Sequence, residues 1–359
     1  MIPDRRPTRR VYVGAVPLGD GTPITVQSMT NTDTRDVTAT LSQVRALRAA
    51  GAAIVRVGVP DMESARSLRA ICAQSPVPVV ADIHFDHRLA LASLEAGVAK
   101  VRLNPGNLSE GGAQQVVEAA ARRGVPIRVG ANSGSLPKDI RRDLGTGPEA
   151  LAEAALGQIR ILERADFEDI VVSVKASDVT TTVRANEILA EKTDYPLHLG
   201  ITEAGTPRRG TIRSSVGIGY LLGRGIGDTV RVSLTADPVL EVEAGLEILR
   251  AWNLAPGGLR IISCPTCARC RVDLLPVAQG VEDALEGVEG NLTVAIMGCE
   301  VNGPGEARAA DVGLCCGRGG GVLVKRGRIL RRVAEEDMIA ELVDLVHRVL
   351  EEDAGNRDA

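Results

Sequence analysis

The hydrophobic pattern of this chain repeats one unit about eight times between Ile24 and Trp252. Each unit is a short run of apolar, largely β-branched residues, then a loop, then a segment whose apolar residues recur at helical spacing. The predicted strands are residues 25–29, 53–59, 78–83, 100–103, 126–130, 169–174, 197–201 and 229–234. The predicted helices are residues 36–50, 62–73, 88–96, 112–123, 148–165, 179–192, 216–222 and 238–252.

Strands that alternate with helices predict a parallel sheet. Eight such units over about 230 residues suit a closed (β/α)8 TIM-like barrel, which we predict for residues 1–253. A doubly wound open sheet is the alternative. That fold calls for a glycine fingerprint after its first strand, and Gln27-Ser28-Met29-Thr30-Asn31 is not one.

A stretch rich in proline and glycine, residues 253–258, predicts a domain boundary. Residues 254–359 then have the pattern of a small α/β domain. Its predicted strands are residues 259–263, 292–297, 311–315 and 322–325, and its predicted helices are residues 272–285 and 335–350.

Composition and charge narrow the classes of function. The 359 residues are 44% hydrophobic and 25% charged, as in soluble globular proteins. Aromatic residues make up only 2%, and the net charge is −4, which argues against a nucleic-acid-binding protein. We expect no membrane span, because no run of 18 apolar residues occurs. The basic first ten residues lack the apolar core of a secretory signal.

Polar residues gather where the predicted barrel strands end. Chemistry in such barrels occurs at the carboxyl ends of the strands, and at least five of the eight carry a cation there. We therefore predict a pocket for a polyanion, most simply a diphosphate, since arginine binds phosphate through paired hydrogen bonds. Internal salt bridges, such as Lys100 or Arg102 with Asp82 or Glu203, are the alternative. The polar residues at or near these strand ends are Arg56, His84, Lys100, Arg102, Asn104, Arg128, Asn132, Lys175, His198, Glu203, Arg231 and Ser233, and of these His198 is interpreted as structural.

The predicted second domain carries a cluster of cysteines. Cys264 and Cys267 form a C-x-x-C pair, and Cys299 adds a third thiolate from a distant loop. A zinc site would call for a second such pair or two histidines, so an iron–sulfur cluster is favoured over zinc and over a redox-active pair. Seven cysteines, four of them between Cys264 and Cys299, also favour a reducing cytoplasm and metal ligation over disulfides.

The fourth ligand of such a cluster has two candidates. Cys270 extends the spacing to C-x-x-C-x-x-C, whereas Glu306 ends a loop shaped by Pro304 and two glycines. A carboxylate is a hard ligand that iron in a cluster holds weakly, so it could give way to a substrate oxygen. An all-thiolate cluster would more naturally only transfer electrons. Cys72, Cys315 and Cys316 are predicted to be buried apolar residues.

Eight motifs in a fixed order resemble the bacterial 4-hydroxy-3-methylbut-2-enyl diphosphate synthases of the non-mevalonate isoprenoid pathway. The resemblance extends from about residue 8 to residue 350. The motifs lie at residues 26–34, 54–57, 81–85, 102–107, 132–136 and 200–205, and at Ser263-Cys264-Pro265-Thr266-Cys267 and Gly298-Cys299-Glu300-Val301-Asn302-Gly303-Pro304-Gly305-Glu306.

The resemblance implies an activity and its cofactor. These enzymes open the ring of 2-C-methyl-D-erythritol 2,4-cyclodiphosphate reductively, with loss of water, using two electrons from reduced flavodoxin or ferredoxin. It implies a [4Fe–4S] cluster and a homodimer in which the cluster domain of one subunit closes over the barrel of the other. The implied cluster ligands are Cys264, Cys267, Cys299 and Glu306.

The resemblance also implies roles for individual residues. Glu203 matches a barrel carboxylate near the reacting carbons, and Asn302 a cluster-domain residue that reaches the substrate; with Glu306 they are the predicted catalytic residues. The implied diphosphate contacts are Arg56, Arg102, Arg128, Lys175 and Ser233. Further predicted substrate contacts are His84, Asn104, Asn132, Arg231 and Ser263.

One residue departs from the family pattern, since the family does not rely on a cysteine at the position of Cys270. Two other functions fit parts of the sequence. A barrel enzyme without redox chemistry, such as a pterin-binding methyltransferase or an aldolase, could use Lys175 for a Schiff base. A non-enzymatic electron carrier is the second, and the cation-lined barrel argues against it.

Overall fold

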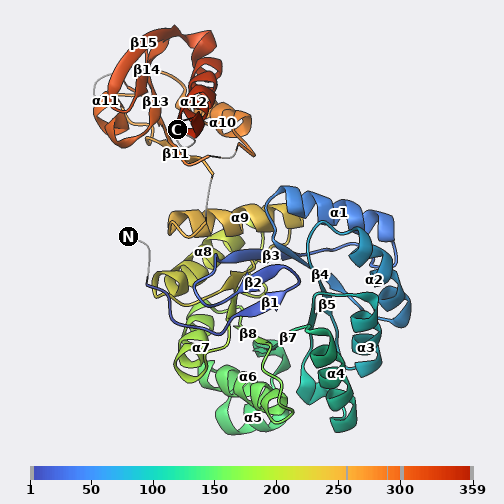
Figure 1. Cartoon of the computed structure of the whole chain (residues 1–359). Helices are drawn as coiled ribbons and strands as arrows, with labels where there is room; N and C mark the ends of the chain where they lie inside the picture. The colour runs from blue at the N-terminus through green and yellow to red at the C-terminus, as the bar shows by residue number, and fades with distance from the viewer. Residues whose placement is uncertain (1–3, 256–257, 289, 300–302, 356–359) are drawn as a thin grey trace. The chain divides into compact units, whose positions relative to one another are not determined.

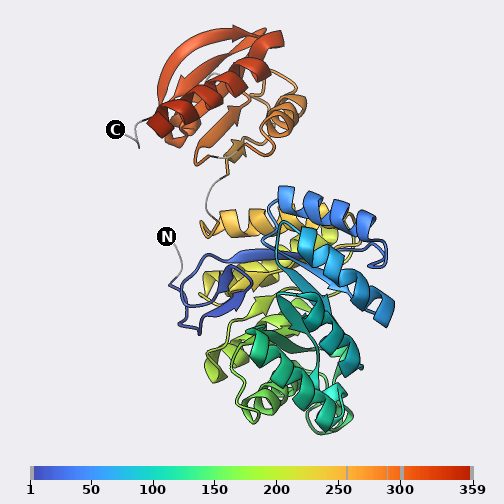
Figure 2. The same ribbon diagram turned by 45° about the vertical axis from the view of Figure 1, so that its right-hand side comes forward.

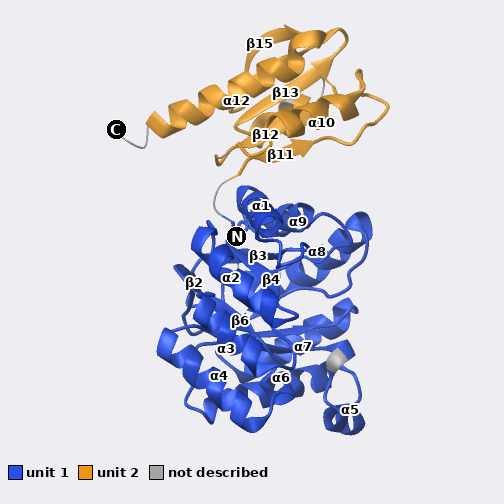
Figure 3. Ribbon diagram, turned by 90° about the vertical axis from the view of Figure 1, so that its right-hand side faces the viewer, with its two compact units in different colours: residues 1–255 blue, residues 256–359 orange. Residues whose placement is uncertain are grey.

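The chain folds into two compact units, residues 1–255 and 256–359, which Figure 3 colours separately. The computed structural model describes residues 4–255, 258–288, 290–299 and 303–355. The first unit ends two residues beyond position 253, where the sequence predicts the end of the barrel domain. No helix within these described ranges has the length and apolar character needed to cross a lipid bilayer.

The first unit is a barrel of eight parallel strands with helices around it, as Figure 1 shows. Its strands are hydrogen-bonded in the order β8-β7-β6-β5-β4-β3-β10-β9, and a parallel bridge between Val172 and Leu197 joins β8 to β9. The predicted (β/α)8 fold is confirmed, and the doubly wound alternative is wrong. The strands are β3 (Thr25–Met29), β4 (Ile54–Gly58), β5 (Val79–Asp82), β6 (Lys100–Arg102), β7 (Ile127–Asn132), β8 (Ile170–Lys175), β9 (His198–Leu199) and β10 (Thr229–Val230).

The helices of this unit follow the predicted order, with two differences. Helix α8 begins at residue 207 rather than 216, because Thr206 and a proline in its first turn start it before any apolar residue recurs. The short helix α5 (Lys138–Leu144) is not predicted by the sequence pattern. The others are α1 (Val37–Ala49), α2 (Met62–Gln74), α3 (His87–Ala96), α4 (Glu110–Arg123), α6 (Pro148–Glu163), α7 (Val179–Lys192), α8 (Pro207–Gly223) and α9 (Pro238–Ala251).

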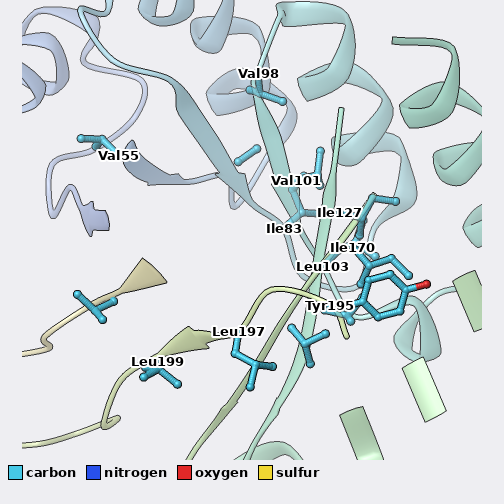
Figure 4. Close-up of a cluster of buried hydrophobic side chains, with 14 of the residues drawn as sticks. Val55, Ile83, Val98, Val101, Leu103, Ile127, Ile170, Tyr195, Leu197 and Leu199 are labelled. Carbon is cyan, nitrogen blue, oxygen red and sulfur yellow. The ribbon is translucent and has the colours of Figure 1, made fainter. Parts of the chain in front are cut away.

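Aliphatic side chains fill the space between the strands and the surrounding helices. Figure 4 shows part of this shell, including Val55, Val101, Ile127 and Ile170, all of which are fully buried. Each such side chain contributes about 1.5–3 kcal/mol when it is removed from water. Because side chains alternate along a strand, the residues between these positions point into the barrel. Those inward positions carry the candidate site.

A hairpin closes the amino-terminal end of the barrel. Strands β1 (Val11–Val13) and β2 (Val16–Leu18) pair antiparallel, and the turn between them uses Gly14 at φ 59°. Their buried side chains pack on the inward-facing residues Ile54, Val80 and Val171 near the strand starts. Apolar side chains therefore cover this end of the barrel interior.

The second unit is a five-stranded sheet in the order β11-β12-β13-β14-β15, with the first three strands parallel and the last two antiparallel. Figure 2 shows α12 running along one face of this sheet. The elements are β11 (Arg260–Ser263), α10 (Leu274–Ala284), β12 (Thr293–Met297), α11 (Gly303–Glu306), β13 (Val312–Gly317), β14 (Gly320–Lys325), β15 (Arg328–Ala334) and α12 (Met338–Gly355).

The two faces of this sheet bury different sets of side chains. On one face, Leu314 and Cys316 pack with α10 and α12. On the other, Met297 and Cys315 pack with Ala307, just after α11. The prediction that Cys315 and Cys316 are buried apolar residues is confirmed, and burial raises the pKa of each thiol to about 12. Cys72, predicted to be a core residue, is half-buried against the barrel core.

Candidate functional site

Three neighbouring strands place charged side chains at one level inside the barrel. In the parallel register Asp82 of β5 lies opposite Arg102 of β6, and Arg102 lies opposite Arg128 of β7. Lys175 ends β8 opposite Asn132. These positions alternate with the outward aliphatic residues, so their side chains share the interior. The strand register therefore gathers residues that lie far apart in the sequence.

Asp82 is the centre of the charge network. Its carboxylate lies 3.3 Å from Nη1 of Arg102, 3.9 Å from Nε of Arg56 and 3.7 Å from Nε2 of His84. Burial acts to raise the pKa of Asp82, but Arg56, His84 and Arg102 outweigh it and hold the pKa well below its ordinary value. Asp82 is thus an anion, and the salt bridge between Arg102 and Asp82 that the alternative interpretation contained is present.

The remaining cations have few acidic partners. Arg128 is buried and donates from Nη1 to the hydroxyl of Ser173 at 3.0 Å, and Arg231 lies 3.4 Å from Glu241. The charged groups that act most on Lys175 are themselves cations, led by Arg128. With Arg56 and Arg102, five cations face Asp82 and Glu241. A buried charge without a partner is costly, so this arrangement is expected to bind a polyanion.

The crowding of cations is visible in their acid–base properties. Burial, reinforced by the neighbouring arginines, lowers the pKa of Arg128 and Lys175 well below their ordinary values, and burial lowers that of Arg56 to about 10. These shifts arise first from the removal of the charges from water and then from the repulsion between neighbouring cations. A bound diphosphate would remove this repulsion by supplying the missing negative charge.

A second polar layer is buried within the same barrel. Lys100 and His198 are fully buried, and neither Nζ of Lys100 nor either ring nitrogen of His198 has a hydrogen-bond partner among the described residues. Burial and the cations nearby lower the pKa of both groups. His198, which the sequence suggests is structural, thus belongs to the interior of the candidate site.

The depressed lysine pKa values predict that anion binding is linked to protons. A bound anion raises the pKa of Lys175 towards its ordinary value of 10.5, so binding takes up a proton in the interval below that value. The affinity for inorganic pyrophosphate should therefore fall as pH rises through this interval. Calorimetry in two buffers of different ionisation enthalpy measures the uptake.

Lys175→Met is the control for that prediction, because the titration of pyrophosphate itself is common to both proteins. The variant should show less proton uptake and a weaker pH dependence than the unaltered chain. Identical proton uptake in the two proteins would show that Lys175 does not titrate on binding.

The mouth of the barrel carries strained and polar residues. Glu203 and Phe85 adopt positive φ angles of 53° and 64°, which side chains other than glycine rarely tolerate and which often mark functional sites. Both are exposed, as is His84, whose ring lies 6.0 Å from that of Phe85. Asn104 accepts a hydrogen bond from the amide of Gly106, which shapes the loop after β6.

The structure adds residues that the sequence did not single out. Met29 places its sulfur 2.9 Å from Nη2 of Arg56, and Glu241 of α9 holds Arg231. Gly200 makes room for Lys175, since a Cβ at that position would lie 2.5 Å from the lysine Nζ. The sequence of α9 does not mark Glu241 for such a role, because the helix carries Glu243 and Glu247 as well.

The cysteines of the second unit follow the ends of two parallel strands. The last residue of β11, Ser263, pairs with Ile296 of β12, and Cys264 donates its backbone N–H to Ile296 at 3.1 Å. Cys299 follows β12 by two residues. Carboxyl ends of parallel strands meet at one edge of a sheet, so Cys264 and Cys299 lie at the same edge.

Backbone groups organise the loops at this edge. The N–H of Gly298 donates to Sγ of Cys264 at 3.1 Å, and the N–H of Cys270 donates to the carbonyl of Cys267 at 2.9 Å. Gly303, at the start of α11, donates to the carbonyl of Cys299 at 3.1 Å. This last bond ties the segment that ends at Glu306 to the cysteine edge.

The donor set at this edge suits an iron–sulfur cluster. Cys267 and Glu306 are exposed, Cys264 is half-buried and Cys299 is buried. No three histidine, cysteine, aspartate or glutamate side chains in the described ranges are placed to hold a single metal ion. A four-iron cluster binds each ligand through a different iron, so its ligands stand farther apart than those around one ion. The predicted catalytic residue Asn302 lies outside the described residues.

Comparison with protein families places both units. Residues 8–246 match the family described as GcpE TIM-barrel domain, and residues 260–348 match GcpE protein C-terminal domain. The chain belongs to the GcpE family. This GcpE chain is also 56% identical to "4-hydroxy-3-methylbut-2-en-1-yl diphosphate synthase (flavodoxin)" of Geobacter sulfurreducens, over 96% of this chain and 98% of the relative. The Clostridium perfringens protein of the same name is 49% identical, over 96% and 100%.

A solved structure resembles the barrel of this GcpE chain. Dihydropteroate synthase from Stenotrophomonas maltophilia superposes with a TM-score of 0.52, covering 68% of this chain and 97% of that one. Its sequence identity is 17%, so the likeness concerns the barrel fold alone. The likeness therefore assigns no role to the site residues of the GcpE chain.

Proposed function

We propose that the chain converts 2-C-methyl-D-erythritol 2,4-cyclodiphosphate into (E)-4-hydroxy-3-methylbut-2-enyl diphosphate by two-electron reduction with loss of water. The observation that carries the proposal is the set of buried cations around Asp82, which is short of negative charge and lies beneath the barrel mouth. Near-complete coverage of relatives that bear the synthase name supports it. We further propose that the protein is cytoplasmic.

The barrel residues would hold the diphosphate. Arg56 lies within β4 and Arg128 near the start of β7, whereas Arg102 and Lys175 end β6 and β8. All four face the barrel interior and can donate several charge-assisted hydrogen bonds to phosphate oxygens. Arg231 and Ser233, two positions apart after β10, extend the donor set on the far side. Such fixed donors would hold the ring with its carbon skeleton towards the mouth.

Residues at the mouth would act on the carbon skeleton. Glu203 is exposed there in a strained conformation. We propose that it either stabilises the charge that develops on the carbon skeleton or donates the proton with which the departing hydroxyl leaves as water. His84, held at 3.1 Å by Nη1 of Arg102, and Asn132 are proposed to position the ring. Asn104 of the barrel and Ser263 and Asn302 of the second unit are the remaining proposed contacts.

We propose that Cys264, Cys267, Cys299 and Glu306 hold a [4Fe–4S] cluster. Such a cluster supplies electrons singly at low potential, and an iron with an exchangeable carboxylate ligand adds a Lewis-acid position. The N–H of Gly298, at 3.1 Å from the Cys264 sulfur, would donate a hydrogen bond to that sulfur as it binds iron. Flavodoxin, named in the relatives' titles, is the proposed electron donor, and ferredoxin is the other candidate.

The experiment that tests this function is purification without oxygen, followed by iron and sulfide analysis and turnover. Brown, iron-containing protein should convert the cyclic diphosphate to the open-chain product when a chemical reductant is supplied. Full activity in colourless, iron-free protein would exclude the cluster, and iron-loaded protein that leaves the substrate unchanged would exclude the reaction. A lysine-dependent aldolase, the alternative that uses Lys175, would need no reductant.

We also propose a homodimer whose active site combines the barrel of one subunit with the cluster unit of the other. Subunits carrying Glu203→Gln should be inactive alone, as should those carrying Cys299→Ser. Mixed dimers would then contain one intact pair of units, so mixing should recover activity, up to about a quarter of normal for random pairing at one active site per mixed dimer. Sites formed within one subunit would leave the mixture inactive.

A further inference from the structure

The sulfur atoms of Cys270 and of the proposed cluster ligand Cys264 both lie close to Gly298. A Cβ built on Gly298 would lie 2.5 Å from Sγ of Cys270 and 3.5 Å from Sγ of Cys264, so both sulfurs adjoin the same point of the backbone. Cys270 donates its S–H to the carbonyl of Val272 at 3.3 Å. Both cysteines are half-buried. A side chain at position 298 would therefore collide with the Cys270 sulfur, and the glycine leaves this space beside both sulfurs open.

Cys270 lies on a different face of the sheet from the segment that carries Glu306, the other candidate for the fourth ligand. Cys270 packs against the apolar residues on the α10 and α12 face of the sheet, where a Cβ at Gly298 would also meet Leu274. Ala307, the residue after Glu306, packs on the opposite face with Cys315. Cys264 contacts both groups. Cys270 is therefore placed to react with Cys264 rather than to take the place of Glu306.

We propose that Cys270 is the resolving thiol of Cys264: when peroxide destroys the cluster, the two residues form a disulfide. This inference rests on the proposed cluster but requires no substrate and no turnover, so its test is separate from the test of the reaction. The disulfide would protect Cys264 from irreversible oxidation and would keep it from binding iron until a dithiol reduces it.

The chemistry balances with hydrogen peroxide as the oxidant. The Cys264 thiolate attacks peroxide, so that an S–O bond forms, the O–O bond breaks and hydroxide leaves. The Cys270 thiolate then attacks the sulfur of that sulfenic acid, forming the S–S bond and releasing the oxygen as water. In sum, two thiols and one peroxide give one disulfide and two waters.

Two other disulfides could form among these three cysteines. Cys264 with Cys267 and Cys267 with Cys270 both have C-x-x-C spacing, and Cys267 is the most exposed of the three. From spacing and exposure alone, a disulfide through Cys267 is expected. The geometry around Gly298 favours Cys264 with Cys270 instead.

The test uses the full-length, cluster-containing protein, titrated with hydrogen peroxide while iron release is followed. Free thiols are then blocked, and the protein is digested and analysed by mass spectrometry without reduction. Trypsin cuts after Arg269, so a Cys264–Cys270 link joins two peptides, and fragmentation identifies which cysteine is bridged. We expect this link to accumulate as iron is lost and to disappear with dithiothreitol, after which iron and sulfide restore the cluster.

Two kinds of variant complete the test. Cys270→Ser, which keeps a donor for the Val272 carbonyl, should lose the link and accumulate sulfinic acid at Cys264; Cys270→Ala is a second version if the serine variant folds poorly. Cys316→Ser changes a buried cysteine on the same face and should keep the link. A link from Cys267 to either neighbour, or no link at all, would overturn the proposal.

Discussion

Replacing Arg128 by methionine is expected to weaken the binding of pyrophosphate and of the cyclic diphosphate by roughly 30- to 4,000-fold, the equivalent of about 2–5 kcal/mol. Arg128 is buried at the centre of the cation group, and a single hydroxyl, that of Ser173, is its neighbour at 3.0 Å. Methionine keeps most of the volume but removes the donors and the charge. Calorimetry with pyrophosphate measures the loss directly, without any need for the cluster.

The same substitution should not destabilise the fold. Arg56 and Arg102 repel Arg128 in the free protein, so its removal is expected to leave the free energy of unfolding unchanged or to raise it. Arg123→Met, at the exposed end of α4, is the matched control and should alter neither property. A variant that unfolds readily but still binds pyrophosphate normally would show that Arg128 has a structural role.

Replacing Glu306 by alanine is expected to lower the iron content of air-free protein and to reduce turnover by at least about 100-fold, the upper end of what losing an outer-sphere partner of a metal site costs. Glu306 ends α11 and is the one carboxylate proposed as a ligand, so its loss leaves three thiolates for four irons. Iron and sulfide analysis, the visible absorption and the rate of product formation report the three effects separately.

Cys270→Ser is the control for that variant, and it should retain the cluster and the activity. The reverse pattern, with iron lost from Cys270→Ser and kept in Glu306→Ala, would assign the fourth ligand to Cys270. It would also remove the exchangeable carboxylate from the proposed mechanism. The two variants therefore decide between the alternatives that the C-x-x-C-x-x-C spacing leaves open.

The barrel could be predicted because its strands obey one simple rule. Val55, Val101 and Ile127 face the helices, and their neighbours Arg56, Lys100 and Arg128 face inward, so the sequence itself alternates between apolar and charged residues. Charged residues within a strand are costly unless they line a cavity. This cost is why the basic pocket could be recognised before its geometry was known.

Other elements gave no comparable signal. Strands β1 and β2 have three residues each, too few for a period to appear. Strand β15 is almost entirely exposed and carries adjacent arginines, so its sequence does not alternate. It pairs with β14 through its backbone, which no side-chain pattern records.

The balance of charge within the site could not be predicted from the sequence. The sequence indicates which cations line the barrel but not which of them are paired. Asp82 lies close to Arg56, Arg102 and His84 together, and Glu241 reaches Arg231 from a helix. The position of Cys270 was likewise open until the backbone at Gly298 showed its neighbour. Such contacts are set by packing between distant segments, which spacing alone does not encode.

The hairpin of β1 and β2 leaves the barrel interior accessible from one end only. Because Val11, Val13 and Leu18 seal one end against Ile54 and Val80, arrival and departure must share the opposite opening. A product that keeps the diphosphate would then obstruct the next substrate until it has left. The product should accordingly inhibit competitively with the substrate. At saturating substrate concentrations the release of product would limit the rate.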